Sequence, residues 1–180
     1  MNYWLIITEG STEKALLDVL LNKGLLRFEK TELIYHQIFH ARQLDQAMIQ
    51  RIRNTGHGNT VSILRLGDKL SDKLKLKSKE LESGKITEII KVCIKPEFEI
   101  LMILNEGLYG EYFKKKSKMH PCEFYQSKNP KYRKQPEYVT KYFESMTKEE
   151  ILALINIYDQ KRKKTHSRDE NTLSYIVVRH

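Results

Sequence analysis

The chain is poor in cysteine, proline and glycine, and each shortage excludes a class of protein. Its 180 residues include 2 Cys, 4 Pro and 8 Gly. So little glycine and proline excludes collagen-like and linker-like chains. The two cysteines, Cys93 and Cys122, lie far apart and outside any CxxC pair, which argues against a zinc site. Cysteines used in this way fit a reducing compartment, so we expect a cytoplasmic protein.

Long hydrophobic runs are also missing. No stretch approaches the roughly 18 uncharged apolar residues that suggest a membrane-spanning helix, so we expect no membrane partner. The first residues, "MNYWLII", lack the basic segment and the cleavage site of a signal peptide. Hydrophobic residues still make up 40% of the chain, which is enough for a sizeable core.

Negative charge is in short supply. The chain has 32 Lys and Arg against 23 Asp and Glu, a formal net charge of +9. A soluble protein this basic often has a polyanionic partner, and nucleic acid is the commonest one. A general richness in lysine, without any such partner, is the alternative.

Strand and helix patterns alternate through the first part of the chain. Apolar or β-branched runs predict strands at residues 3–7, 33–39, 60–66 and 86–94. Helical patterns follow from Ser11 to Gly24, over 41–54, from 68 to about 82, and from Pro96 to about 105. Ser11 is expected to cap the first helix and Pro96 to open the fourth. This alternation predicts an α/β fold, with a mostly parallel sheet and helices on both faces.

The rest of the chain has a different character. Residues 110–136 are basic and aromatic, and we expect a long loop there. Helices are predicted at 137–144 and 148–164, the second opened by a capping box of Thr147 and Glu150. The run "TLSYIVV" predicts a final strand that returns to the sheet. We therefore divide the chain into an α/β core, residues 1–106, and a basic helical and loop elaboration, residues 107–180.

Acidic residues follow three of the predicted strands. Glu9 and Asp68 end the first and third strands, Asp72 lies one helical turn after Asp68, and Glu97 and Glu99 follow the fourth strand. The carboxyl ends of parallel strands share one edge of the sheet, where ligands bind. Carboxylates that meet there repel each other unless a cation is present. Their hard oxygens suit Mg²⁺ or Mn²⁺, ions that serve phosphodiester chemistry.

The first strand–helix junction adds Gly10 and Glu13 to this edge. Glycine allows a close backbone turn and leaves the helix N-terminus open to a phosphate. An ordinary explanation also exists, because acidic residues are favoured at helix caps and in first helical turns. For Glu13 and Asp68 both explanations stay open.

Three segments carry a resemblance to a known family. "IITEGSTE", "ILRLGDKLSD" and "CIKPEFEILMIL", within residues 3–106, resemble the Toprim domain of topoisomerases, primases, small rRNA maturases and overcoming-lysogenization-defect nucleases. The "EGxTE" and "PEFE" forms are most similar to the last group and its small stand-alone relatives. The resemblance implies a compact α/β sheet, dependence on Mg²⁺ and the cutting or joining of nucleic-acid strands. Small proteins of this kind also resemble components of bacterial defence against phage.

The resemblance implies roles for single residues by their position. Glu9 and Asp68 match the catalytic acids, and a lysine such as Lys69 or Lys73 would stabilise developing charge. Leu70 occupies the second position of the family's Asp-x-Asp motif and cannot bind a metal. The later glutamate matches Glu99, or less well Glu97. The implied metal ligands are Glu9, Glu13, Asp68, Asp72, Glu97 and Glu99.

A basic, aromatic segment runs from Lys114 to Lys134, with eight Lys or Arg and Glu123 as its only acid. Lysines neutralise phosphates and aromatic rings stack on unpaired bases. A solvated loop whose aromatic rings pack on the core is the alternative. We predict nucleic-acid binding by Lys114, Lys115, Lys116, Lys118, Tyr125, Lys128, Lys131, Tyr132, Arg133 and Lys134.

Three functions fit these features. The first is a metal-dependent nuclease acting on DNA or RNA, with or without an ATPase partner subunit. The second is a non-catalytic nucleic-acid-binding subunit with a degenerate Toprim-like fold, in which the acids are dispersed or paired with lysines. The third, a phosphotransferase, is disfavoured because no GxxxxGK[ST] or GxGxxG loop is present.

Overall fold

Four parallel strands form the centre of the molecule in the computed structural model, which describes residues 1–67, 74–76, 83–162 and 171–178. The strand order is β2-β1-β3-β4, and each neighbouring pair is parallel. The expected α/β fold is confirmed. The strands are β1 (Asn2–Thr8), β2 (Phe39–His40), β3 (Thr60–Gly67) and β4 (Ile86–Cys93).

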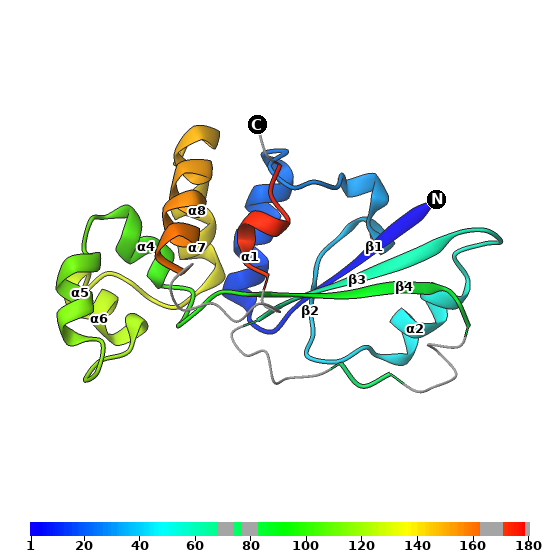
Figure 1. Cartoon of the computed structure of the whole chain (residues 1–180), viewed down its shortest axis with the longest axis horizontal. Coiled ribbons are helices and arrows are strands. Elements are labelled where there is room, and N and C mark those ends of the chain that lie inside the picture. Colours follow the sequence, from blue (N-terminus) through cyan, green and yellow to red (C-terminus); the bar gives the residue numbers. More distant parts are fainter. Residues whose placement is uncertain (68–73, 77–82, 163–170, 179–180) are drawn as a thin grey trace.

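Helices lie on both faces of the sheet and beyond its carboxyl edge (Figure 1). Within the described ranges they are α1 (Ser11–Asn22), α2 (Gln46–Arg53), α4 (Ile100–Asn105), α5 (Tyr109–Lys115), α6 (Pro121–Lys128), α7 (Pro136–Glu144) and α8 (Lys148–Arg162). On one face, Met48 and Ile52 of α2 pack on Ile63 of β3. On the other, α1 and the C-terminal helices share a single hydrophobic cluster with the sheet.

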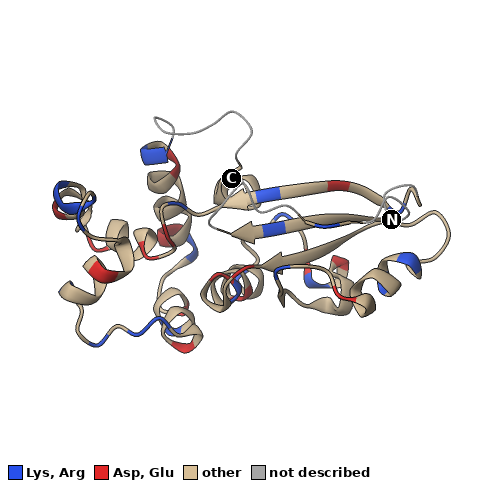
Figure 2. Cartoon of the chain, turned by 90° about the horizontal axis from the view of Figure 1, so that it is seen from below, with Lys and Arg blue, Asp and Glu red and all other residues tan. Residues whose placement is uncertain are grey.

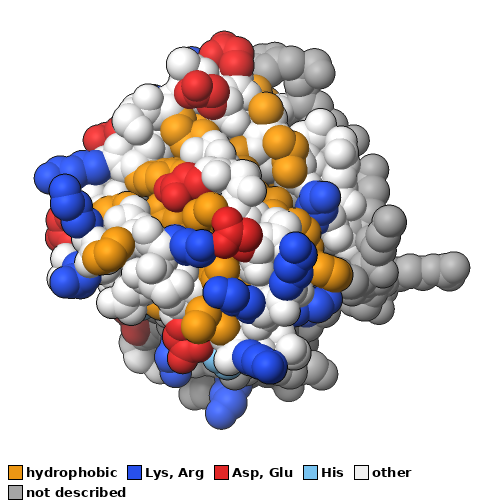
Figure 3. Space-filling model, turned by 90° about the vertical axis from the view of Figure 1, so that its left-hand side faces the viewer, with side chains coloured by type: hydrophobic (Ala, Val, Ile, Leu, Met, Phe, Trp, Pro, Cys, Tyr) orange, Lys and Arg blue, Asp and Glu red, His pale blue; other side chains and the backbone are white. Residues whose placement is uncertain are grey.

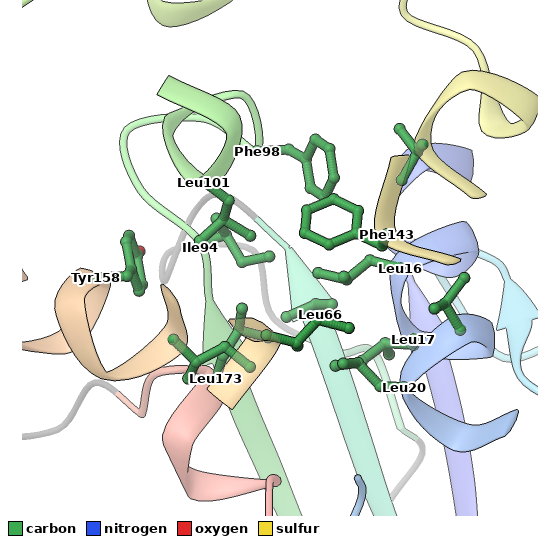
Figure 4. Packing of buried hydrophobic residues seen from close by; sticks show 14 of the residues in the cluster. Leu16, Leu17, Leu20, Leu66, Ile94, Phe98, Leu101, Phe143, Tyr158 and Leu173 are labelled. Carbon is green, nitrogen blue, oxygen red and sulfur yellow. The ribbon is translucent and has the colours of Figure 1, made fainter. Parts of the chain in front are cut away.

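The larger cluster joins segments that are far apart in sequence. Leu16 of α1, Leu66 of β3 and Phe143 of α7 point toward one another in Figure 4, with Leu173 near the C-terminus beside them. All four side chains are almost fully buried. The strands carry few charged residues, and most of the charge lies on helices and connections (Figure 2). None of the helices that the structure describes has the length and apolar character needed to cross a membrane.

Some local signals act as the sequence predicts, and others do not. Gly24, at φ 65°, follows the end of α1, and glycine adopts this left-handed conformation without steric cost. The capping box of Thr147 and Glu150 is confirmed by two hydrogen bonds, one in each direction. Ser11 is not the cap of α1, because Gly10 occupies the N-cap position and no side chain bonds there.

The predicted second strand, residues 33–39, is wrong over most of its length. Two 3₁₀ turns, Lys30–Glu32 and Ile34–His36, occupy this region, and only Phe39–His40 pairs with β1. Tyr35 and His36 both have positive φ, which interrupts an extended chain. The helix that follows begins later than predicted, at Gln46, where Asp45 accepts a hydrogen bond from the backbone of Met48.

The expected long loop at 110–136 is also wrong, because most of it is helical. All of α5 except its first residue falls within it, and α6 begins with Pro121 in its first turn and a capping box of His120 and Glu123. Proline in that position favours a helix start, and this signal was missed. The helix expected from Pro96 begins instead at Ile100, after a turn that buries Phe98.

The final strand is replaced by a 3₁₀ helix, Leu173–Tyr175, whose apolar side chains pack into the core. Only isolated bridges remain, from Asn171 to Val92 and from Val177 to Leu26. These residues reach the edge of β4 without extending the sheet. The basic helix predicted from 68 to about 82 lies largely outside the described residues, and the part that is described, residues 74–76, is not helical. The end of the helix predicted to reach 164 also lies outside the described residues.

Candidate functional site

A hollow of about 400 Å³ opens at the junction between β1 and α1. Residues 9–13 form one wall, and Arg42 and Lys134 reach it from two distant segments. It lies at the carboxyl end of β1, where the sequence predicted ligand binding. Two of the predicted acids, Glu9 and Glu13, therefore share a cavity with two cations.

Glu9 is held by the sheet itself. Its backbone N–H donates to the carbonyl of Leu66 at 3.0 Å, which continues the β1–β3 ladder by one residue. Its carboxylate lies 2.8 Å from the Arg65 guanidinium, and the two side chains are 12% and 4% exposed. A β-carbon on Gly67 would collide with this carboxyl group, so the glycine makes room for it.

Arg65 was missed by the sequence analysis, although a signal existed. It is the one charged residue in the otherwise buried run "TVSILRL" of β3. A charged side chain in a buried strand needs a partner, because leaving it unpaired in the interior is costly. That argument predicts an acid nearby, and Glu9 supplies it.

Glu13 folds back over the start of α1. Thr12 donates a hydrogen bond to its Oε2 at 2.9 Å, and a β-carbon on Gly10 would collide with its carboxyl group. This position near the helix N-terminus stabilises negative charge, as the ordinary explanation for Glu13 requires. The side chain also lines the hollow, so its predicted role as a metal ligand stays open.

Arg42 and Lys134 provide the positive charge of the hollow. Arg42 follows β2 and was not predicted, whereas Lys134 was predicted as a nucleic-acid contact. Nearby, the His40 ring lies 3.2 Å from the carbonyl oxygen of Glu9. The lining of the hollow therefore carries charges of both signs.

Glu99 is completely buried beside this hollow and does not line it. It accepts a hydrogen bond from the Tyr132 hydroxyl at 2.7 Å, and the Lys134 ammonium lies 3.2 Å away. Burial is the largest single influence and lowers the pKa of Lys134, but the charge of Glu99 and its hydrogen bond, with smaller contributions from Cys122 and Glu97, together raise the pKa. Burial, followed by the charge of Glu99, also raises the pKa of the nearby Cys122 thiol to about 11.

Glu97 is directed toward the start of α6. Its Oε2 accepts the backbone N–H of Cys122 at 3.1 Å, and its Oε1 lies 3.8 Å from His120. Its side chain thus helps to satisfy a helix N-terminus. Of the two later glutamates, neither joins Glu9 and Glu13 in the lining of the hollow.

The remaining predicted site residues, Asp68, Lys69, Asp72 and Lys73, lie outside the described residues. Among the residues that are described, no group of three or more His, Cys, Asp or Glu is arranged to hold a metal. Glu9 and Glu13 nevertheless offer carboxylate oxygens to one cavity, and this donor set fits a hard cation such as Mg²⁺ or Mn²⁺.

The basic segment divides into buried and exposed parts. Tyr125 and Tyr132 are 0% and 1% exposed, so they pack in the core and do not offer a ring to bases. Lys128 pairs with Glu111 and lowers its pKa. Arg133 donates to the backbone carbonyls of its own turn. Lys114, Lys115, Lys116, Lys118 and Lys131 are exposed, and so are Lys128 and Lys134, which pair with Glu111 and Glu99.

The fold and the hollow define an α/β protein with a parallel sheet and a mixed-charge cavity at its carboxyl edge. The chain matches no protein-family model, and no curated protein or solved structure is significantly similar to it. The resemblance to the Toprim domain therefore stays a prediction from the quoted segments.

Proposed function

We propose that the protein is a metal-dependent nuclease that hydrolyses phosphodiester bonds in DNA or RNA. The observation that carries the proposal is the hollow in which Glu9 and Glu13 lie together with Arg42 and Lys134. It lies at the carboxyl edge of a parallel sheet, which is the usual ligand site of such folds. The Toprim-like segments support the same activity.

The acidic residues of the hollow are suited to bind a metal ion, and its basic residues are suited to bind a phosphate. Glu9 and Glu13 would hold Mg²⁺ or Mn²⁺, which supplies an activated water and polarises the phosphate. Arg42 and Lys134 bind phosphate oxygens, and the backbone N–H groups at the start of α1 add to that attraction. Buried Arg65 orients the Glu9 carboxylate through their ion pair and excludes water from the side of the carboxylate that it contacts.

A second function is favoured by one specific observation. Glu9 is paired with Arg65, and Glu99 is paired with Lys134. Paired acids are what a non-catalytic nucleic-acid-binding subunit with a degenerate fold requires. The nuclease is preferred because Glu13 and Arg42, at the same hollow, add a carboxylate and a cation that this pairing does not explain.

Exchanging Glu9 for glutamine tests the proposal. Glu9→Gln keeps the size of the side chain and removes its charge, so we expect metal-dependent cleavage to fall by at least about a hundredfold. Purified wild type and variant are incubated with Mg²⁺ or Mn²⁺ and with single- and double-stranded DNA and RNA, and the products are separated on gels. Glu144→Gln, an exposed change on α7, is the control and should cleave normally.

The outcomes separate the two functions. Cleavage by wild type that needs the metal and Glu9 supports the nuclease. Nucleic-acid binding without cleavage by any of the proteins supports the non-catalytic subunit. A cytoplasmic location, a role in defence against phage and an ATPase partner remain part of the proposal, and repeating the assay with added ATPase would test the last.

A further inference from the structure

A second and larger cavity lies in the helical part of the molecule. It has a volume of about 920 Å³ and runs between α4, α5 and α8. The described residues that line it include none of those that line the hollow at Glu9. We call it the helical groove. Its volume is at the upper end of the range for small-molecule pockets, so it has room for a ligand larger than one metal ion or phosphate.

The charge of the helical groove has one sign. Its described lining contains five basic residues and no acidic one. They come from the connection between β4 and α4, from α5 and its C-cap, and from the end of α8. The five are Lys95, Lys114, Lys116, Lys161 and Arg162. A concave surface lined by charges of one sign attracts a ligand of the opposite sign, which here is a polyanion.

Aromatic rings lie between these cations. Phe113 is 51% exposed, which is unusual for so large an apolar side chain, and the ring of Tyr109 lies 6.0 Å from it. The Lys116 ammonium is 3.9 Å from the centre of the Phe113 ring, and that of Lys161 is 5.2 Å from the Tyr109 ring. Basic and hydrophobic side chains are interspersed on this end of the molecule (Figure 3).

The floor of the groove is mostly apolar and belongs to the core. Ile100 and Leu104 of α4 and Tyr158 of α8 line it from below and are buried. They belong to the main hydrophobic cluster, which fixes the helices that carry the rings and the lysines. The groove is thus bordered by aromatic rings and by cationic side chains.

We propose that the helical groove binds a segment of single-stranded nucleic acid. Unpaired bases stack on the exposed ring of Phe113 and beside the partly exposed ring of Tyr109, while the lysines neutralise the phosphates that connect the bases. In a duplex the faces of the bases are stacked on one another inside the helix. A duplex could therefore bind the lysines through its phosphates but could not stack on the rings. This inference rests on the proposed function in one respect, the choice of nucleic acid as the ligand. Binding of a single strand in the groove does not require cleavage at the hollow.

The test is equilibrium binding of fluorescently labelled single-stranded DNA and RNA oligonucleotides, measured by anisotropy in EDTA to suppress cleavage. We expect Phe113→Ala to weaken binding of single strands by at least about fivefold, because one stacked base is lost. Phe113→Trp should retain binding or strengthen it. Tyr35→Ala is the matched control, because Tyr35 is 46% exposed and also has a cation, Arg51, near its ring.

A second measurement addresses the lysines. Changing Lys114, Lys116 and Lys161 together to alanine should lower the slope of log affinity against log salt by about 2, as three phosphate contacts are lost from a single strand. Circular dichroism confirms that each variant folds. An equal loss for single strands and duplexes in Phe113→Ala would contradict stacking and overturn the proposal.

The outcomes also distinguish this inference from the nuclease proposal. If wild type binds single strands through Phe113 but does not cleave them, the groove proposal is supported and the nuclease proposal is wrong. If wild type cleaves while Phe113→Ala and the lysine variant bind and cleave normally, the groove proposal is wrong and the nuclease stands. Self-association that depends on Phe113, without oligonucleotide binding, would assign this face to a protein interface and overturn the inference.

Discussion

At the scale of single residues, the Glu9 carboxylate depends on two neighbours in β3. Arg65 pairs with it, and Gly67 leaves the space that it fills. Breaking a buried ion pair by removing one partner leaves an uncompensated charge and is strongly destabilising. The position of a proposed metal ligand is thus set by residues that would not touch the metal.

Gly67→Ala should disturb this arrangement directly. The new methyl group would overlap the Glu9 carboxyl group and displace it from Arg65, and because a flexible side chain can shift, we expect a cost of about 1 kcal/mol, at the lower end for overpacking. We expect a lower denaturation midpoint in urea and a loss of metal-dependent cleavage. Gly110→Ala, where the added methyl group meets no atom within 4 Å, is the control and should not destabilise the protein. Unchanged stability and activity in Gly67→Ala would contradict the close packing.

At the scale of elements, the connection between α6 and α7 is attached to the core by polar groups. Tyr132, in this connection, donates its hydroxyl to buried Glu99, and Lys134 pairs with the same carboxylate. Its ring also packs edge-on against Tyr125 of α6 and Tyr138 of α7. One tyrosine therefore joins three helices and positions the lysine that reaches the hollow.

Tyr132→Phe removes the hydroxyl and keeps the ring. A hydrogen bond to a charged group contributes about 1.5–3 kcal/mol, so we expect the free energy of unfolding to fall by that amount. Urea denaturation measures it. Tyr142→Phe is the matched control, because its partner Asn105 is exposed and water can replace the lost bond. Equal effects of the two changes would show that the Glu99 contact has no special importance.

At the scale of the whole molecule, the hydrophobic cluster crosses the predicted boundary between residues 106 and 107. Leu16 and Leu66 come from the core segment, and Phe143 and Ile155 from the elaboration. Figure 4 shows how closely some of these side chains meet. A shared core of this kind makes independent folding of the two parts unfavourable, since each would expose apolar surface alone.

We therefore expect one cooperative unfolding transition. The single tryptophan, Trp4, lies in β1 and reports on the sheet, while far-UV circular dichroism reports mainly on the helices. The two probes should give the same midpoint in urea, as two-state unfolding requires. Phe143→Leu should lower both midpoints together. Separate transitions would show that residues 1–106 and 107–180 are distinct folding units.

Sequence reasoning worked best where the signal is local. The runs of β1, β3 and β4 were located within one or two residues, because β3 is buried along most of its length and β1 and β4 are buried toward their carboxyl ends. The strand predicted around Ile34 was wrong, because the β-forming residues there adopt 3₁₀ turns. Pro121 was treated as a loop residue although it opens a helix.

The sequence alone determined that acids end the strands and that a parallel sheet brings such ends to one edge. Only the tertiary structure decided that Glu9 pairs with Arg65, that buried Glu99 accepts a hydrogen bond from Tyr132, and that Lys134 reaches the hollow. The physical reason is the distance along the chain over which each kind of interaction acts. Periodicity and caps act over a few residues, whereas the partner of a buried charge comes from whichever distant segment the packing of the core brings near it.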